Sequence, residues 1–247
     1  MTQIENESAL PEMSFLDHLV ELRKRLFYII ISLVVTGIIC FIFSKEMIDI
    51  LIKPALNLNP PIQLQVLKIQ GMFVVQVLVA FAGGFILSIP IIVYQIWAFV
   101  KPGLYRKEQK WVGLLIVTTF LCFIAGAAVA YYVMIPLALR FFMRISEPYA
   151  VSTIIAINYY IRFVVTLMLS FGVVFELPVL SFILAKMGVL SAAFMKKSRK
   201  YALVIIFIVA AILTPPDPFT QLLLAFPLLF IYEISIFIIQ MTEKKSS

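Results

Sequence analysis

Long apolar runs without charge are the feature that most constrains how this chain can fold. The longest extends from Gly71 to Val100 and contains no charged side chain. About 20 consecutive apolar residues are enough for a helix to cross the hydrocarbon core of a bilayer. Because 63% of the 247 residues are hydrophobic and only 13% are charged, no water-soluble core could enclose so much apolar surface. The sequence therefore predicts an all-α polytopic membrane protein.

Six spans are expected in a single domain that covers residues 1–247. Residues 1–25 are hydrophilic and lack the charged-then-apolar form of a cleavable signal peptide. The fifth apolar run is short, and we interpret it as a span because otherwise the two basic segments beside it would face opposite sides of the membrane. The six spans are expected at about 26–43, 71–100, 111–139, 163–185, 201–214 and 219–239.

Two polar stretches, 44–70 and 140–162, are expected to lie outside the membrane. The first is expected to be partly helical and broken at its prolines, because proline lacks the backbone N–H that a helix interior needs. Pro90 is expected to kink the second span or to mark where it tilts. Glu176 and Pro178 are expected to interrupt the fourth span.

The distribution of Lys and Arg predicts the orientation. Residues 1–25, the hinge 101–110, the loop 186–200 and the C-terminal tail hold fourteen of these residues, whereas the connections on the opposite side hold six. Basic loops are retained on the cytoplasmic side of a membrane. Both termini are therefore predicted to be cytoplasmic, and the net charge of +7 is explained without nucleic acid as a partner.

The sequence offers little that could support catalysis. It has no glycine-rich phosphate loop, no dinucleotide fingerprint and no Cys/His cluster with metal-ligand spacing. His18 is the only histidine and cannot build a zinc site alone, and Cys40 and Cys122 both lie within apolar runs. No catalytic residue, metal or cofactor is therefore expected, and the chain is not expected to be an enzyme.

Two acidic residues near the predicted cytoplasmic surface have two interpretations each. Glu21 precedes Arg25 by four residues, which is the favourable order for an ion pair within a helix. Glu108 lies among Lys107 and Lys110 and could be a solvated loop charge. Alternatively, both carboxylates accept guanidinium groups from a partner, since such charge-assisted pairs are strong and geometrically selective.

Acids within or beside the later spans are also open to two interpretations. Glu176 lies in the middle of a span, where an acid either fixes helix packing or serves a polar pocket or pathway. Glu233 could reach toward the headgroups, and Asp217 could cap the helix that follows it. A proton-coupled transporter of a small solute would use Glu176 as its coupling acid, whereas a structural scaffold would tolerate loss of these acids.

Several motifs together resemble one known family. The chain contains His18-Leu-Val-Glu-Leu-Arg-Lys-Arg-Leu26, Pro90-Ile-Ile-Val-Tyr-Gln-Ile-Trp-Ala-Phe99 and Pro102-Gly-Leu-Tyr-Arg-Lys-Glu108. It also contains Phe171-Gly-Val-Val-Phe-Glu-Leu-Pro178 and Leu213-Thr-Pro-Pro-Asp217. With their spacing from residue 18 to 233, they resemble TatC, the multispanning receptor subunit of the twin-arginine protein translocase.

The resemblance implies a concave, glove-like bundle of six helices in a bacterial-type inner membrane. It implies binding of twin-arginine signal peptides on folded cargo and transport driven by the proton-motive force. The acids that match the family's arginine-binding pair are Glu21 and Glu108. Other positions that the resemblance assigns to the signal peptide are Leu22, Arg23, Phe99, Pro102 and Tyr105.

The resemblance also implies a pocket and partners within the membrane. Glu176 matches an acid on the concave face of the bundle. Partners of the TatA and TatB type, each with a single span, are expected at Thr214, Asp217 and Gln221. Self-association in a multimeric receptor complex and contact with membrane lipid are expected as well.

Overall fold

A computed structural model describes residues 15–100, 112–147, 154–213 and 218–244. These residues are almost entirely helical, which confirms the predicted all-α class, and two three-residue strands form the only sheet in the described part of the chain. The elements in chain order are α1 (Phe15–Ile42), α2 (Ser44–Leu56), β1 (Gln63–Gln65), α3 (Gly71–Val100), α4 (Val112–Val129), the π-helical turn η3 (Ala130–Met134), α5 (Ile135–Ser146), β2 (Ile154–Ala156), α6 (Ile157–Val174), α7 (Leu177–Lys186), α8 (Ala192–Lys197), α9 (Arg199–Leu213) and α10 (Pro218–Lys244).

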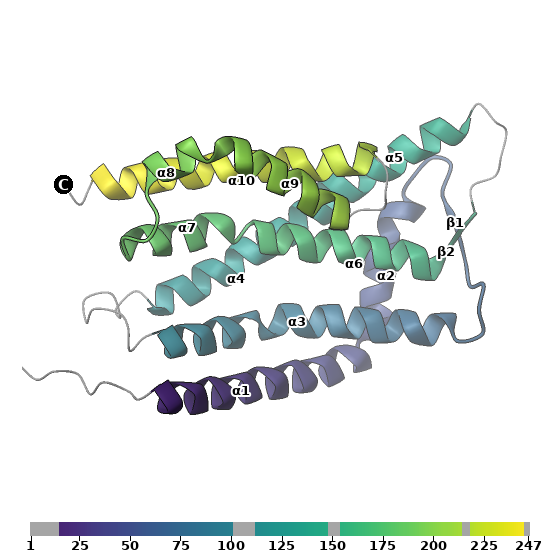
Figure 1. The fold of residues 1–247 in the computed structure, drawn as a ribbon. Helices are drawn as coiled ribbons and strands as arrows, with labels where there is room; N and C mark the ends of the chain where they lie inside the picture. The colour runs from purple at the N-terminus through teal and green to yellow at the C-terminus, as the bar shows by residue number, and fades with distance from the viewer. Residues whose placement is uncertain (1–14, 101–111, 148–153, 214–217, 245–247) are drawn as a thin grey trace, which may run out of the picture.

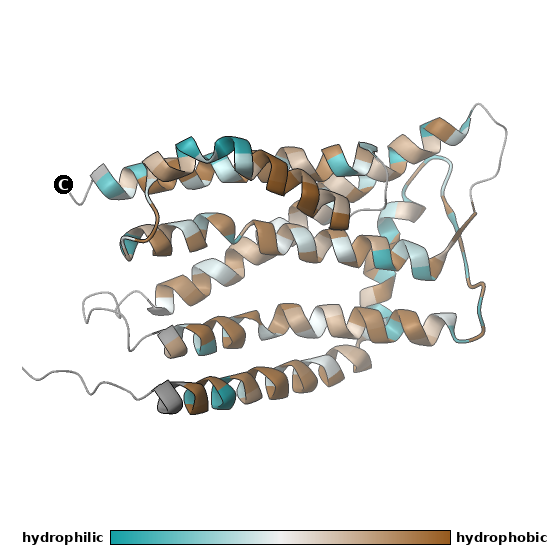
Figure 2. Ribbon diagram, in the orientation of Figure 1, coloured by the Kyte–Doolittle hydropathy of each residue, from teal (hydrophilic) through white to brown (hydrophobic). Residues whose placement is uncertain are grey.

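The long helices lie side by side, and α2 crosses them near one end (Figure 1). Among the described residues, five helical stretches are long and apolar enough to cross a membrane: Leu19–Ile42, Gly71–Phe99, Gly113–Ser146, Ile157–Lys186 and Pro218–Glu243. Apolar residues cover most of their length in Figure 2. The chain is therefore a multispanning membrane protein, as predicted.

The predicted fifth span corresponds to α9, which has 15 residues. At 1.5 Å per residue it covers about 22 Å, less than the roughly 30 Å of a hydrocarbon core. Its role as a sixth span remains a prediction. The start of α1 and the end of α10 lie at the same end of the bundle, which fits an even number of crossings (Figure 1).

The centre of the bundle is α6. Its buried side chains Ile161, Val164, Leu167 and Phe171 follow helical spacing and form one apolar stripe. This stripe is possible because α6 has neighbours on several sides, with α3, α4 and α9 all packing against it. The break that carries Glu176 adjoins this core, whereas α1, which carries Glu21, packs mainly against α3.

The first polar stretch differs from the sequence expectation at Pro54. α2 is not broken there but continues to Leu56, with Pro54 buried inside its last turn. A proline at this position cannot donate a hydrogen bond to the carbonyl of Ile50. The hydroxyl of Tyr131 donates to that carbonyl instead, at 2.7 Å, and so replaces the missing bond.

The second polar stretch also contains more helix than expected. α5 continues the third span to Ser146, beyond the predicted limit at residue 139, and α6 begins at Ile157, before the predicted start at residue 163. Between them, β2 pairs in parallel with β1, with Leu64 opposite Ile155. The helices of the spans thus extend past their purely apolar segments.

Close packing joins α1 to α3, because a Cβ added to Gly84 would lie 2.7 Å from the Cα of Gly37. Three hydroxyl groups strengthen this contact. The Thr36 hydroxyl donates to the Gly84 carbonyl at 2.9 Å and lies 2.7 Å from the Ser88 hydroxyl, which accepts from Ser32 at 3.2 Å. Small residues and hydroxyl hydrogen bonds are the usual means of helix association in lipid.

α3 continues through Pro90 as one helix, so that residue does not end the second span. α1 and α3 are joined by more contacts than any other pair of described elements. The close approach at Gly84 is therefore part of an extensive contact between the two helices.

Candidate functional site

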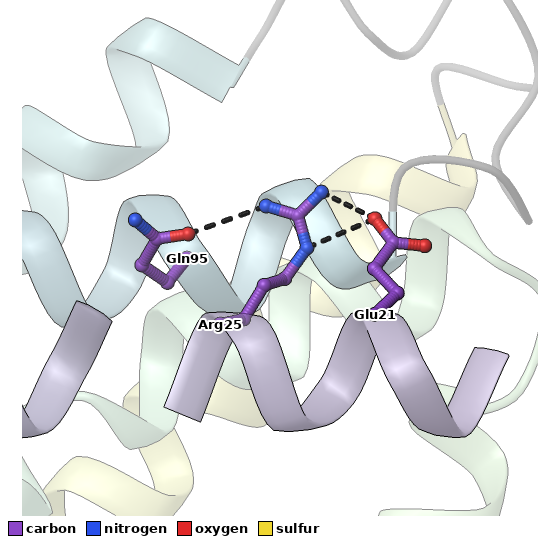
Figure 3. A network of polar contacts seen from close by, with 3 residues as sticks. All are labelled: Glu21, Arg25 and Gln95. Atoms are coloured by element: carbon purple, nitrogen blue, oxygen red, sulfur yellow. Dashed lines mark hydrogen bonds and ion pairs between the residues drawn. The ribbon is translucent and has the colours of Figure 1, made fainter. Parts of the chain in front are cut away.

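The first candidate site lies on α1, where Glu21 is half-buried with 20% of its side chain exposed. Arg25 lies one helical turn further on, and its Nε donates to Oε1 of Glu21 at 3.0 Å. Nη2 of Arg25 contacts the same oxygen, so one carboxylate oxygen receives both N–H groups (Figure 3). The ion pair predicted within this helix is confirmed.

Arg25 also connects α1 to the neighbouring helix. Its Nη1 donates to Oε1 of Gln95 on α3 at 3.2 Å, which places the guanidinium between a carboxylate and an amide (Figure 3). Gln95 precedes Phe99 by one turn, and Trp97 between them is buried with 7% exposure. Gln95 was not identified from the sequence, although it lies within a motif that carried the resemblance.

The other oxygen of the Glu21 carboxylate is left open. Oε2 is shielded from solvent and has no hydrogen-bond partner among the described residues. A buried acceptor without a donor is energetically unfavourable. Glu21 can therefore accept a further hydrogen-bond donor without losing Arg25, and a guanidinium is the donor best suited to a carboxylate. Leu22 and Arg23, which follow Glu21, are exposed.

The second candidate site is at Glu176, where the fourth apolar run is interrupted as predicted. α6 ends at Val174 and α7 begins at Leu177, because Pro178 cannot donate to the Val174 carbonyl that a continuous helix would pair with it. Glu176 lies in this break, and its backbone N–H donates to the Val173 carbonyl at 3.1 Å.

The carboxyl of Glu176 faces α4. Thr119 and the backbone of Phe123 lie near it there, while Oε1 is buried without a partner among the described residues. The approach is close because a Cβ added to Gly126 on α4 would lie 2.4 Å from the Phe171 carbonyl oxygen of α6. Thr119 was missed in the sequence, where a buried hydroxyl within an apolar run was its only signal.

Two further polar residues join the last helices to each other. Glu233 pairs with Arg199 on α9 at 2.6 Å, and both side chains are 51% exposed, so this acid serves an interhelical ion pair. The amide of Gln221 donates to the Phe207 carbonyl of α9 at 3.1 Å. Both contacts fix α10 against the short helix α9.

The chain matches one family of membrane proteins over most of its length. Residues 17–227 match the family described as "Sec-independent protein translocase protein (TatC)". The chain belongs to the TatC family. A TatC of Magnetococcus marinus is 37% identical over 93% of this chain and 84% of its own length. The TatCy protein of Bacillus subtilis is 36% identical over 95% of this chain and 92% of its own length.

Solved TatC structures have the same fold. The crystal structure titled "Twin Arginine Translocase Receptor- TatC" superimposes with a TM-score of 0.83 at 37% identity, covering 91% of this chain and 98% of that chain. A second structure of this receptor in DDM gives a TM-score of 0.82 at 38% identity, with 89% and 98% coverage. The predicted fold class and the resemblance to TatC are both confirmed.

Membership of the TatC family also confirms the predicted functional class. The chain is a subunit of the Sec-independent protein translocase and not an enzyme. As the function of the whole chain, this assignment replaces the small-solute transporter and the structural scaffold. Five predicted site residues lie outside the described part of the chain: Pro102, Tyr105, Glu108, Thr214 and Asp217.

Proposed function

We propose that this TatC-family chain is the receptor subunit that binds twin-arginine signal peptides, with Glu21 as one of two guanidinium acceptors. The observation that supports this is the state of the Glu21 carboxylate. One of its oxygens already accepts two N–H groups from a guanidinium, and the other is shielded from water and has no donor among the described residues. An arginine of a signal peptide would supply the missing donor.

Arginine is the expected ligand because its planar guanidinium presents several N–H groups in a fixed fork, which the ammonium of lysine does not. A hydrogen bond to a charged group contributes about 1.5–3 kcal/mol in a shielded site. Because Glu21 is partly exposed, screening by water places the effect toward the lower part of this range. Two such sites would favour Arg-Arg over Lys-Lys by more than charge alone.

Glu108 is proposed as the second acceptor, together with Phe99, Pro102 and Tyr105. Gln95 supports this arrangement because it binds the guanidinium of Arg25 from α3, the helix that precedes Pro102, Tyr105 and Glu108 in the chain. Glu176 is proposed to face the apolar part of the signal peptide within the membrane. The break between α6 and α7 supports that role because Oε1 of Glu176 is buried there and has no donor among the described residues.

The remaining proposals concern partners and location. Single-span partners of the TatA and TatB type are proposed to bind near Thr214, Asp217 and Gln221, in a multimeric complex driven by the proton-motive force. The membrane is proposed to be a bacterial cytoplasmic membrane with both termini in the cytoplasm. The excess of Lys and Arg at that end supports this orientation.

Site-specific crosslinking of a signal peptide tests the proposal. Glu21→Gln and Glu108→Gln should each weaken crosslinking of an Arg-Arg peptide and reduce its advantage over a Lys-Lys peptide. Glu46→Gln is the matched control, because Glu46 is an exposed acid on α2 at the opposite end of α1. Unchanged Arg-Arg preference in both site variants, at normal protein levels, would contradict the proposal.

A further inference from the structure

α2 lies at the end of the bundle opposite the start of α1 (Figure 1). Two neighbouring grooves there are lined by residues of α2 and α5. Their volumes are about 980 Å³ and about 560 Å³. Both are lined by Asn57, Leu58 and Arg140, so they share one wall. The predicted signal-peptide residues do not contribute to either groove.

The charges of the grooves are mainly positive. Arg140 and Arg144 lie one turn apart on α5 and both line the larger groove, while Lys53 lines the smaller one. Glu147 is the one acid among the lining residues. Within the described part of the chain, the two ion pairs join Glu21 to Arg25 and Glu233 to Arg199, so neither neutralises a groove cation. The grooves are therefore lined by three basic side chains and one acidic side chain.

The position of Arg140 and Arg144 along the third helical stretch indicates their depth relative to the membrane. Arg140 and Arg144 follow the predicted end of the third span at residue 139 and lie near the end of the helical stretch Gly113–Ser146, which is longer than a hydrocarbon core is thick. Tyr131 and Tyr132 also line the smaller groove, and their rings meet edge to face with centroids 4.8 Å apart. Tyrosine is typical of the boundary between hydrocarbon and headgroups.

The border of the grooves is apolar and open to the outside of the bundle. Tyr132 is 75% exposed, Ile50 is 51% exposed and Leu137 is 47% exposed. Tyr132 and Leu137 fall within the third predicted span, 111–139, and so would contact acyl chains, whereas Ile50 lies on α2, beyond the spans. A ligand with a phosphate at the cations and a hydrocarbon tail along these residues would match both parts of the surface.

We propose that these grooves form a binding site for the phosphate headgroup of an anionic phospholipid. Arg140 contacts the phosphate from the wall that both grooves share, with Lys53 and Arg144 on either side and the amide of Asn57 as a neutral donor. Basic pockets between membrane helices are suited to anionic headgroups. An acidic protein segment is less well matched, because it would leave Tyr132, Ile50 and Leu137 uncovered.

Binding at this position would tie α2 to α5 from outside the bundle. At the groove itself, Tyr131 of η3 already donates to the Ile50 carbonyl of α2. The lipid would therefore stabilise the end of the bundle that lies away from Glu21. The inference goes beyond the proposed function and does not depend on it.

Native mass spectrometry of the purified chain tests the proposal, with phosphatidylglycerol and phosphatidylcholine as the competing probes. The test variant is Arg140→Gln with Arg144→Gln. The matched control is Lys68→Gln with Arg162→Gln, because both residues are exposed in the same region, carry the same charge and line neither groove. Thermal unfolding of each variant without lipid shows whether the fold is kept.

The wild type should retain phosphatidylglycerol in preference to phosphatidylcholine. This preference should fall about fivefold for each groove cation removed and stay within about twofold in the control. Equal losses in both double variants, or no loss in the test variant, would overturn the site. Displacement by millimolar inorganic phosphate would show a free-anion site, and retention of an acidic peptide in place of lipid would show a protein partner; either result would also overturn it. If the double variant does not fold, Lys53→Gln alone carries the same test.

Discussion

At the scale of single residues, Glu21 shows that a structural and a functional interpretation can both hold. Its ion pair with Arg25 was expected from a spacing of four residues, yet that pair uses only one carboxylate oxygen. Spacing along the chain cannot predict that the other oxygen stays open. That depends on Gln95, which lies 70 residues away and accepts a hydrogen bond from the opposite side of the Arg25 guanidinium.

Gln95→Ala should weaken signal-peptide binding without removing a carboxylate. Losing the amide frees the Arg25 guanidinium to swing toward Oε2 of Glu21 and occupy the open acceptor. A single hydrogen bond of this kind contributes about 1 kcal/mol, which corresponds to about a fivefold loss of affinity. Crosslinking of Arg-Arg and Lys-Lys peptides measures the effect.

Gln76→Ala is the control for this prediction, since Gln76 is a half-buried glutamine on the same helix. If Gln95 has a purely structural role, its loss would lower thermal stability and weaken crosslinking of both peptides equally. If Gln95 positions Arg25, Gln95→Ala should reduce crosslinking of the Arg-Arg peptide more than that of the Lys-Lys peptide. An equal reduction for both peptides would count against this role.

At the scale of elements, apolar runs predicted the helices well, and errors arose where a distant residue compensates for a proline. Pro54 did not break α2, because Tyr131 donates to the carbonyl that Pro54 leaves free. Pro178 did end a helix, and no comparable donor from another element is present at the Val174 carbonyl among the described contacts. Local sequence contains the proline but not the distant donor.

Tyr131→Phe should therefore destabilise α2 selectively. The variant keeps the ring but leaves the Ile50 carbonyl without a donor, with an expected loss of about 1 kcal/mol because the bond lies at an exposed position. Hydrogen exchange should rise in the last turn of α2. Tyr132→Phe is the control, since Tyr132 is 75% exposed, and equal exchange in both variants would show that the bond does not hold α2.

The contact between α1 and α3 allows a second test at this scale. Gly84→Val places a side chain against the backbone of Gly37 and should destabilise the bundle by about 1–3 kcal/mol. It should also separate Arg25 from Gln95 and weaken peptide crosslinking. Gly113→Val is the control, because a Cβ at Gly113 meets no atom within 4 Å. If folded Gly84→Val protein crosslinks the peptide normally, the packing at Gly84 does not contribute to the geometry of the site.

At the scale of the whole molecule, composition was enough to predict a multispanning helical protein, but not the number of crossings. Five stretches satisfy the length requirement by themselves, whereas α9 has 15 residues. Its contacts with α10 through Arg199 to Glu233 and Phe207 to Gln221 hold it against a full-length span. A helix supported in this way can cross with less apolar length than an isolated one needs, since a bilayer thins locally around a short span.

Cysteine labelling from outside the cell decides both the orientation and the sixth crossing. In a background with Cys40→Ser and Cys122→Ser, a membrane-impermeant maleimide should label Asn59→Cys and Pro216→Cys in intact spheroplasts, but Ser246→Cys only after lysis. Asn59 follows α2 at the end opposite the termini, and Pro216 lies between α9 and α10. Labelling of Ser246→Cys alone before lysis would show that the chain has the opposite orientation. Labelling of Asn59→Cys without Pro216→Cys, even after lysis, would mean that α9 enters the membrane and does not cross it.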